Sequence, residues 1–178
     1  MMEYYRLVQD ERIVNYAYPL NITRRELANQ IAAAIKDEDA ALQFYVNEQS
    51  YYLDWLDDPL YMVSDKFKHI CQKYQTNLVW KPAILANTQT MSQKLYWVLI
   101  ADEVDCLSTS SEWNKDGTLK KMVLDEQKIG ARKICKVQSS LTHEVIVDLD
   151  VAESILKFNL TGIRLYKIDT QVSYAYAK

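Results

Sequence analysis

The chain has 178 residues, of which 49% are hydrophobic and 25% charged, and its net charge is −3. This length suffices for one domain with a substantial core, and the composition excludes a disordered chain. The mild acidity and scattered Lys and Arg residues disfavour nucleic-acid binding, because phosphate contacts need a concentrated basic surface. Only three glycines occur, so no Gly-rich loop that could cradle a phosphate is present.

The predicted elements begin with a strand over residues 3–9, followed by a loop around Pro19, which cannot donate to a sheet ladder. Thr23 and Glu26 have the spacing of a capping box, and apolar residues then recur at helical spacing. This pattern predicts a helix that ends in the acidic stretch 36–40.

Two apolar runs separated by the polar residues 47–50 predict a β-hairpin over residues 42–56. Pro59 ends it, because the residue before a proline avoids the helical conformation. Next come a strand at 60–64, a helix with Ser64 as its N-cap, and a returning strand at 76–85.

The second half of the chain is dominated by apolar segments with strand character. A buried strand is expected to start at Lys94 and to run into an acidic segment, and Lys115-Asp116-Gly117 marks a turn. Further strands are expected at 118–125, 126–138 and 139–148. Asp148 then caps a helix, and a strand at 163–168 follows.

The stretch 61–82 and the stretch 145–168 have the same order of features: a short apolar strand, an amphipathic helix and a second strand. With one extra residue near Leu160, Ser64 aligns with Asp148 and Thr76 with Thr161. Either the unit is duplicated, or two strand–helix–strand units share only a general pattern. The chain is therefore expected to be α+β, with a mixed, mostly antiparallel sheet and about three helices, and residues 1–178 to form a single domain.

The three cysteines, Cys71, Cys106 and Cys135, have no metal-like spacing and are expected to be reduced thiols. The N-terminal residues show no signal-peptide pattern, and the longest apolar run is too short to span a bilayer. These features predict a cytoplasmic protein without a membrane partner, a metal or a cofactor.

Few residues suggest catalysis. His69 and Cys71 are two apart on a predicted helix and so point to different faces, and no nucleophile elbow such as G-x-S-x-G occurs. Acidic clusters near aromatic residues favour instead a surface complementary to a basic partner protein. The candidate contact residues are Asp54, Trp55, Asp57, Asp58, Asp102, Asp105 and Trp113.

The segment from about Tyr61 to Asp169 resembles the immunity proteins of bacterial polymorphic-toxin systems, in particular the group first catalogued as an uncharacterised domain in a myxobacterial protein. The similar segments are YMVSDKFKHI, LVWKPAIL, LYWVLIADEVDCLSTSSEW, MVLDEQKIGARKICKVQ and EVIVDLDVAESILKFNLTGIRLYKI. Gly162-Ile163 and Tyr166 match the family's C-terminal signature, whereas Lys133–Lys136 departs from its aromatic-containing strand. Residues 1–60 have no counterpart in the resemblance.

The resemblance implies a non-enzymatic protein that binds a cognate toxin and occludes it. Two alternatives stay open from the sequence. One is an accessory or structural interaction module, which leaves self-association open. The other is a small hydrolase that uses the carboxylates of 54–58 or 102–105.

Overall fold

The computed structural model describes residues 2–37, 40–48, 51–138 and 144–172. Within them lie four helices: α1 (Arg24–Lys36), α2 (Asp65–Tyr74), α3 (Glu126–Ile129) and α4 (Leu149–Lys157). The strands are β1 (Tyr4–Gln9), β2 (Leu42–Tyr45), β3 (Trp55–Leu56), β4 (Met62–Val63), β5 (Val79–Asn87), β6 (Ser92–Ile100), β7 (Glu103–Val104), β8 (Glu112–Trp113), β9 (Leu119–Lys121), β10 (Val123–Asp125), β11 (Ile134–Val137), β12 (Glu144–Asp148) and β13 (Ile163–Gln171).

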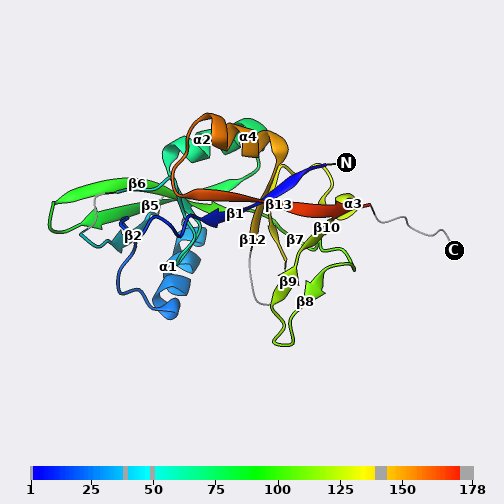
Figure 1. Ribbon diagram of the computed structural model, residues 1–178. Coiled ribbons are helices and arrows are strands. Elements are labelled where there is room, and N and C mark those ends of the chain that lie inside the picture. The colour runs from blue at the N-terminus through cyan, green and yellow to red at the C-terminus, as the bar shows by residue number, and fades with distance from the viewer. Residues whose placement is uncertain (1, 38–39, 49–50, 139–143, 173–178) are drawn as a thin grey trace.

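The strands form three sheets (Figure 1). A six-stranded sheet has the order β10-β13-β1-β12-β11-β7, and a five-stranded sheet has the order β2-β5-β6-β4-β3. The third sheet is the β8–β9 hairpin. Three neighbouring pairs, β10 with β13, β11 with β7 and β2 with β5, are parallel, and the others are antiparallel. The α+β class with a mixed, mostly antiparallel arrangement is therefore confirmed.

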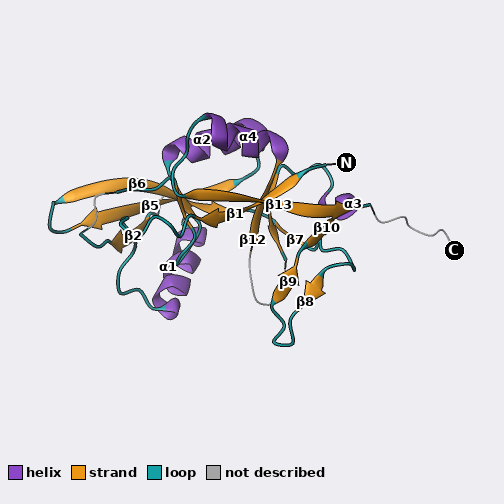
Figure 2. Cartoon of the chain, in the orientation of Figure 1, coloured by secondary structure: helices purple, strands orange, loops and turns teal. Residues whose placement is uncertain are grey.

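The two similar stretches of sequence have the same topology. In β4–α2–β5 and in β12–α4–β13, the helix connects two strands that run in the same direction. One antiparallel strand lies between them, β6 in the first unit and β1 in the second. Figure 2 shows α2 and α4 side by side on one face of the sheets. The repeated pattern in the sequence thus corresponds to two equivalent strand–helix–strand units.

The core is divided by the sheets. Beneath α2 and α4, one apolar cluster joins both large sheets and includes Leu7, Trp55, Leu99 and Val147. On the opposite face, α1 covers the five-stranded sheet. There, side chains of α1 pack with residues such as Phe44. A third cluster fills the other face of the six-stranded sheet.

Helix ends follow the capping residues of the sequence. Thr23 and Glu26 form the expected capping box, with the Thr23 Oγ1 accepting from the Glu26 N–H at 3.2 Å. Ser64 and Asp148 cap α2 and α4 by accepting from the N–H groups of Phe67 and Val151. Each cap satisfies a backbone donor that the first turn of a helix leaves without an intrahelical partner.

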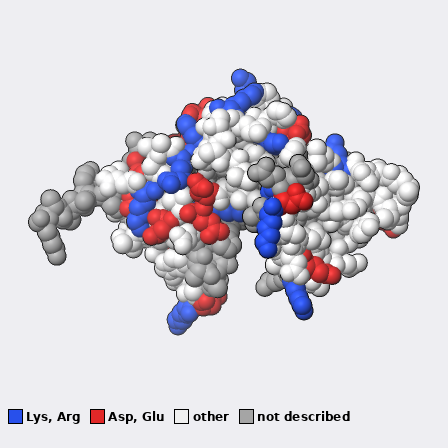
Figure 3. All heavy atoms as spheres, turned by 180° about the vertical axis from the view of Figure 1, so that it is seen from behind, with Lys and Arg blue, Asp and Glu red and all other residues white. Residues whose placement is uncertain are grey.

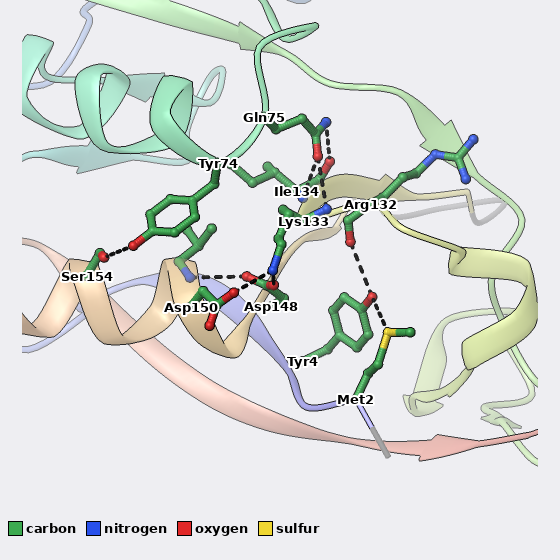
Figure 4. Close-up of polar contacts among 11 residues, drawn as sticks. Met2, Tyr4, Tyr74, Gln75, Arg132, Lys133, Ile134, Asp148, Asp150 and Ser154 are labelled. Carbon is green, nitrogen blue, oxygen red and sulfur yellow. Dashed lines mark hydrogen bonds and ion pairs between the residues drawn. The ribbon is translucent and has the colours of Figure 1, made fainter.

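Polar contacts at the end of α2 connect this helix to β11 and to α4 (Figure 4). The Gln75 Oε1 accepts from the N–H groups of Lys133 and Ile134 at 3.0 and 2.9 Å, and its Nε2 donates to the Ile134 carbonyl at 3.0 Å. The hydroxyls of Tyr74 and Ser154 are 2.6 Å apart. One amide side chain therefore fixes α2 against β11, and a hydroxyl pair fixes it against α4.

Lys133 strengthens the start of α4. Its Nζ lies 2.6 Å from the Asp148 carboxylate and also contacts Asp150. These two hydrogen bonds raise the pKa of Lys133 above its usual value. The cation thereby holds the capping carboxylate in place at the helix N-terminus.

One expectation for the N-terminal part was wrong. The described residues of 42–56 do not pair with each other as a hairpin: β2 pairs in parallel with β5, and the short β3 pairs with β4. Buried and exposed residues alternate along β2 as expected for a strand. Its buried side chains, Leu42 and Phe44, pack against α1 and β5, so burial in the tertiary structure decided which strand β2 pairs with. β1, which also comes from the N-terminal part, lies between β12 and β13 in the six-stranded sheet.

The number of elements also exceeds the expectation, because several short strands and α3 were not recognised. Two-residue strands such as β3 and β7 carry no periodic signal of their own. Among the described residues, no helix is long and apolar enough to cross a membrane.

Candidate functional site

Trp55 is not a contact residue, contrary to the sequence-based expectation. Its side chain has 0% exposure and packs between the rings of Tyr61 and Phe67, at centroid distances of 5.3 and 5.4 Å. Tyr61 directly precedes β4, and Phe67 lies in α2. Trp55 is therefore a core residue beneath α2 and cannot reach a partner.

Asp54 has a structural role. Its carboxylate accepts from the Ser64 Oγ at 2.6 Å, and from the Thr161 N–H and Oγ1 at 2.7 and 3.0 Å. The Asp54 N–H in turn donates to the Thr161 carbonyl at 3.0 Å. These bonds join the start of β3, the N-cap of α2 and the turn before β13, so the carboxylate is engaged within the fold.

Asp57 and Gln9 form a reciprocal pair. The Gln9 N–H donates to the Asp57 Oδ2 at 2.9 Å, and the Asp57 N–H donates to the Gln9 Oε1 at 3.2 Å. The pair ties the end of β1 to the segment after β3. The neighbouring Asp58 is exposed.

The remaining predicted contact residues are on the surface. Asp102 and Asp105 are exposed, and the Asp105 carboxylate lies 3.7 Å from the Lys128 Nζ. Trp113 is 46% exposed on the β8–β9 hairpin. Surface position leaves these three residues able to contact a partner, but Trp113 belongs to a different sheet from the acidic residues.

A crevice lies where the two large sheets meet. It has a volume of about 380 Å³, and we call it the seam crevice. Its walls come from α1, the β3–β4 connection, β6, β7 and β11, and its lining residues are Ile31, Asp57, Pro59, Leu60, Tyr61, Val98, Leu99, Ile100, Glu103 and Lys136. The crevice thus has an apolar interior and a few charged groups, a composition typical of binding sites.

Both acidic clusters of the sequence reach this crevice. Asp57 comes from the β3–β4 connection and Glu103 from β7, and the exposed Asp58 and Asp102 adjoin them in the chain. Figure 3 shows charged side chains around the hollow between the α1 end of the molecule and the β8–β9 end. The fold therefore brings carboxylates from segments more than forty residues apart in the chain to one concavity.

Burial perturbs two further groups in the seam crevice. Desolvation, with the nearby charges of Glu144 and Asp57, raises the pKa of Tyr61 to about 12. The Lys136 Nζ lies 5.6 Å from the centre of the Tyr61 ring, and desolvation lowers the pKa of this ammonium, against the opposing field of Glu103. A half-buried cation thus lies among the acidic groups and partly offsets them.

Sequence patterns did not single out Tyr61 or Lys136 as site residues. Glu103 was visible as part of an acidic run, but Tyr61 and Lys136 appeared only as members of predicted strands. Lys136 faces Glu103 because β11 and β7 pair in parallel, and that pairing has no local signal. Only the meeting of the sheets defines the site.

Other chemistry-bearing residues stay apart. His69 is exposed on α2, with its Nδ1 3.2 Å from the Asp65 carboxylate, whereas Cys71 is buried on the opposite side of the helix. His143 lies outside the described residues. Within the described part of the chain, no three His, Cys, Asp or Glu side chains gather as a metal site would require.

Comparison with known proteins finds no match: neither a protein-family model nor a curated protein matches the chain. The likeness to immunity proteins thus rests on the sequence segments alone.

Proposed function

We propose that the protein binds a cognate toxin domain and occludes it, with the seam crevice and its acidic rim as the docking surface. The supporting observation is the convergence of Asp57 and Glu103, with Asp58 and Asp102 beside them, on an apolar crevice. Such a surface complements a partner segment that carries Lys or Arg residues around an apolar anchor.

Burial of the apolar lining contributes affinity in addition to the attraction between charges. Leu60, Val98 and Ile100 line the crevice, and a partner side chain that fills it would remove their exposed surface from water. The acidic rim then favours a basic partner over an acidic one and accelerates association. Neutralisation follows from stoichiometric coverage of the toxin and needs no reaction.

The test uses the product of the adjacent open reading frame as the partner. Co-expression should restore growth, and the two proteins should copurify as a complex. Charge reversal at the rim by the double substitution Asp58→Lys and Asp102→Lys is expected to weaken the complex at least about tenfold, measured by calorimetry. Both residues are exposed, so the fold should persist.

A control is Glu153→Lys, which reverses one acidic charge, where the rim variant reverses two, on the exposed surface of α4. This variant should bind the toxin as the wild type does. A neighbouring gene product that is neither toxic nor bound contradicts the function. A bound toxin with equal affinity for the rim variant and the control leaves the function standing but rejects the crevice as its site.

A carboxylate-dependent hydrolase is the second candidate. It draws support from Asp57 and Glu103 lining one crevice, but Asp57 is already paired with Gln9. Under this alternative, turnover of a small substrate would be lost in Glu103→Gln, whereas toxin binding predicts no turnover at all.

A further inference from the structure

The outer half of β6 has no neighbour on one side. β6 spans Ser92–Ile100, but its neighbour β4 covers only Trp97 and Val98 before the chain enters α2. Figure 1 shows β5 and β6 projecting beyond α2 and α4 as a long hairpin. Residues Ser92–Leu95 are all exposed, so this part of β6 is an open sheet edge.

The hydrogen bonds that β6 makes with its neighbours show which way its unpaired backbone N–H and C=O groups point. The Leu99 N–H donates to the Tyr61 carbonyl at 2.9 Å, so Leu99 faces the β4 side. Because backbone groups alternate along an antiparallel strand, Leu95 and Gln93 face the same way. Pro82 lies opposite Trp97 and has no N–H to donate. This fits a position where the backbone N–H and C=O groups of Trp97 point away from β5.

The N–H and C=O groups of Gln93 and Leu95 therefore point outward. Within the described residues, no backbone group bonds to them from this side. A cavity of about 610 Å³ lies alongside, and its lining residues are Tyr52, Asp54, Ser64, Asp65, Lys66, Lys94, Leu95 and Tyr96. The Asp65 carboxylate accepts from the Trp97 Nε1 at 3.0 Å and so lies on the face of Leu95, opposite to the face of Lys94. An added strand would continue the line of β4 through this space.

A second copy of the chain fits this edge poorly. If Gln93 of one copy pairs with Leu95 of the other, all the outward N–H and C=O groups of these residues form hydrogen bonds. The same register places Lys94 of one copy directly opposite Lys94 of the other. Like charges in that position destabilise a sheet, and edge lysines oppose self-association. Pairing Gln93 with Gln93 instead would set Leu95 against Met91, which lies in the turn with φ +53°.

The charge of Lys94 and the two faces of β6 indicate an occupant that fits better than a second copy of the chain. Lys94 forms no ion pair within the described residues and lies on the α1 side of the sheet, whereas Leu95 lies on the other face beside Ile84. Figure 3 shows few charged groups at this hairpin end of the molecule. A strand that alternates apolar and acidic residues would pair its acids with Lys94 and its apolar side chains with Leu95.

We propose that the β6 edge at Gln93–Leu95 is a docking site for an extended, acidic segment of a partner protein, which adds a strand to the five-stranded sheet. This strand addition goes beyond the proposed toxin binding. The seam crevice uses the other end of β6 and favours a basic partner, so the two surfaces are separable.

The test uses two short synthetic peptides, one alternating valine with glutamate and one alternating valine with lysine. In the free protein, amide hydrogen exchange should be fast at Gln93 and Leu95 but slow at Lys94 and Tyr96, which bond to β5. The glutamate peptide should slow exchange at Gln93 and Leu95 and bind at least about tenfold more tightly than the lysine peptide.

Two variants probe the backbone and the charge separately. Gln93→Pro removes one outward N–H without removing a bond to β5, and should weaken the glutamate peptide about tenfold. Lys94→Glu should reverse the preference towards the lysine peptide, and it keeps the test valid if the proline variant does not fold. Lys73→Glu, an exposed charge reversal on α2, should change nothing.

Three outcomes would overturn the proposal. Neither peptide changes the exchange of these amides, or both peptides bind the wild type equally, or the free protein is a dimer in which Gln93 and Leu95 are already protected.

Discussion

Gly162 lies directly against Leu53. A Cβ atom at Gly162 would stand 2.7 Å from the Leu53 Cβ, closer than side chains approach, and Gly162 has φ +81°. The contact brings the turn before β13 onto the segment before β3, and so joins the two large sheets.

Gly162→Ala should therefore lower the free energy of unfolding by about 2 kcal/mol or more, from backbone strain together with the forced contact. Gly130→Ala is the control, because Gly130 also has a positive φ of +64° but its nearest neighbour is the flexible end of Arg132 at 3.8 Å. Chemical denaturation compares the two variants. An equal loss in both would show that Leu53 adds nothing.

Asp54→Ala should reduce the free energy of unfolding by about 1–3 kcal/mol, because Ser64 and Thr161 lose the acceptor of three hydrogen bonds. Thermal unfolding with circular dichroism measures the change. Asp102→Ala, at an exposed position, should stay within about 0.5 kcal/mol of wild type. If Asp54→Ala is equally neutral, the carboxylate does not tie the sheets together.

Gln75→Ala leaves the N–H groups of Lys133 and Ile134 without their acceptor (Figure 4). A loss of about 1–3 kcal/mol is expected, with faster hydrogen exchange at the Ile134 amide. Gln72, exposed on the same helix, provides the matched control Gln72→Ala. Unchanged exchange at Ile134 would contradict the role given to Gln75.

Alkaline pH should weaken the fold through buried tyrosines, among them Tyr4 and Tyr61. Burial raises the pKa of Tyr4 and of Tyr61 to about 12, whereas an unfolded tyrosine titrates near 10. Between about pH 10 and 12 the folded protein keeps protons that the unfolded chain loses, so the free energy of unfolding falls as pH rises.

Tyr4→Phe should flatten this part of the pH profile, measured by urea denaturation at a series of pH values. The control is Tyr45→Phe, because Tyr45 is 59% exposed on β2. A profile as steep in Tyr4→Phe as in wild type would rule out Tyr4 as a source of the effect.

All three cysteines are buried free thiols. Burial raises the pKa of Cys71, and the Cys106 and Cys135 side chains form a hydrogen bond with each other. This hydrogen bond lowers the pKa of Cys106 and raises that of Cys135. All three cysteines are at most 1% exposed, so a thiol reagent such as dithionitrobenzoate should label none of them in the native protein and all of them after denaturation. Rapid native labelling would contradict this placement.

Local patterns predicted much of the secondary structure. The capping residues Thr23, Ser64 and Asp148 start their helices as expected, because the groups that satisfy the first backbone donors lie within three residues. The first strand, the turn at Lys115-Asp116-Gly117 and the separation of His69 from Cys71 were likewise predictable from short-range spacing.

The candidate site was less predictable. Asp54 and Asp57 looked like surface carboxylates, yet their partners Thr161 and Gln9 lie 107 and 48 residues away. Trp55 looked like an interface aromatic, but Tyr61 and Phe67 enclose it. Nothing in the local sequence distinguishes a carboxylate or ring that faces solvent from one that the fold covers.

By itself, the sequence determined the helix starts, the strand-forming segments and the twice-used strand–helix–strand pattern, because periodicity and capping act over a few residues. The tertiary structure alone decided that β2 pairs with β5, that β1 enters the middle of a sheet, and that Asp57 and Glu103 line one crevice. Strand pairing joins segments distant in the chain, and its choice depends on which faces can be buried together.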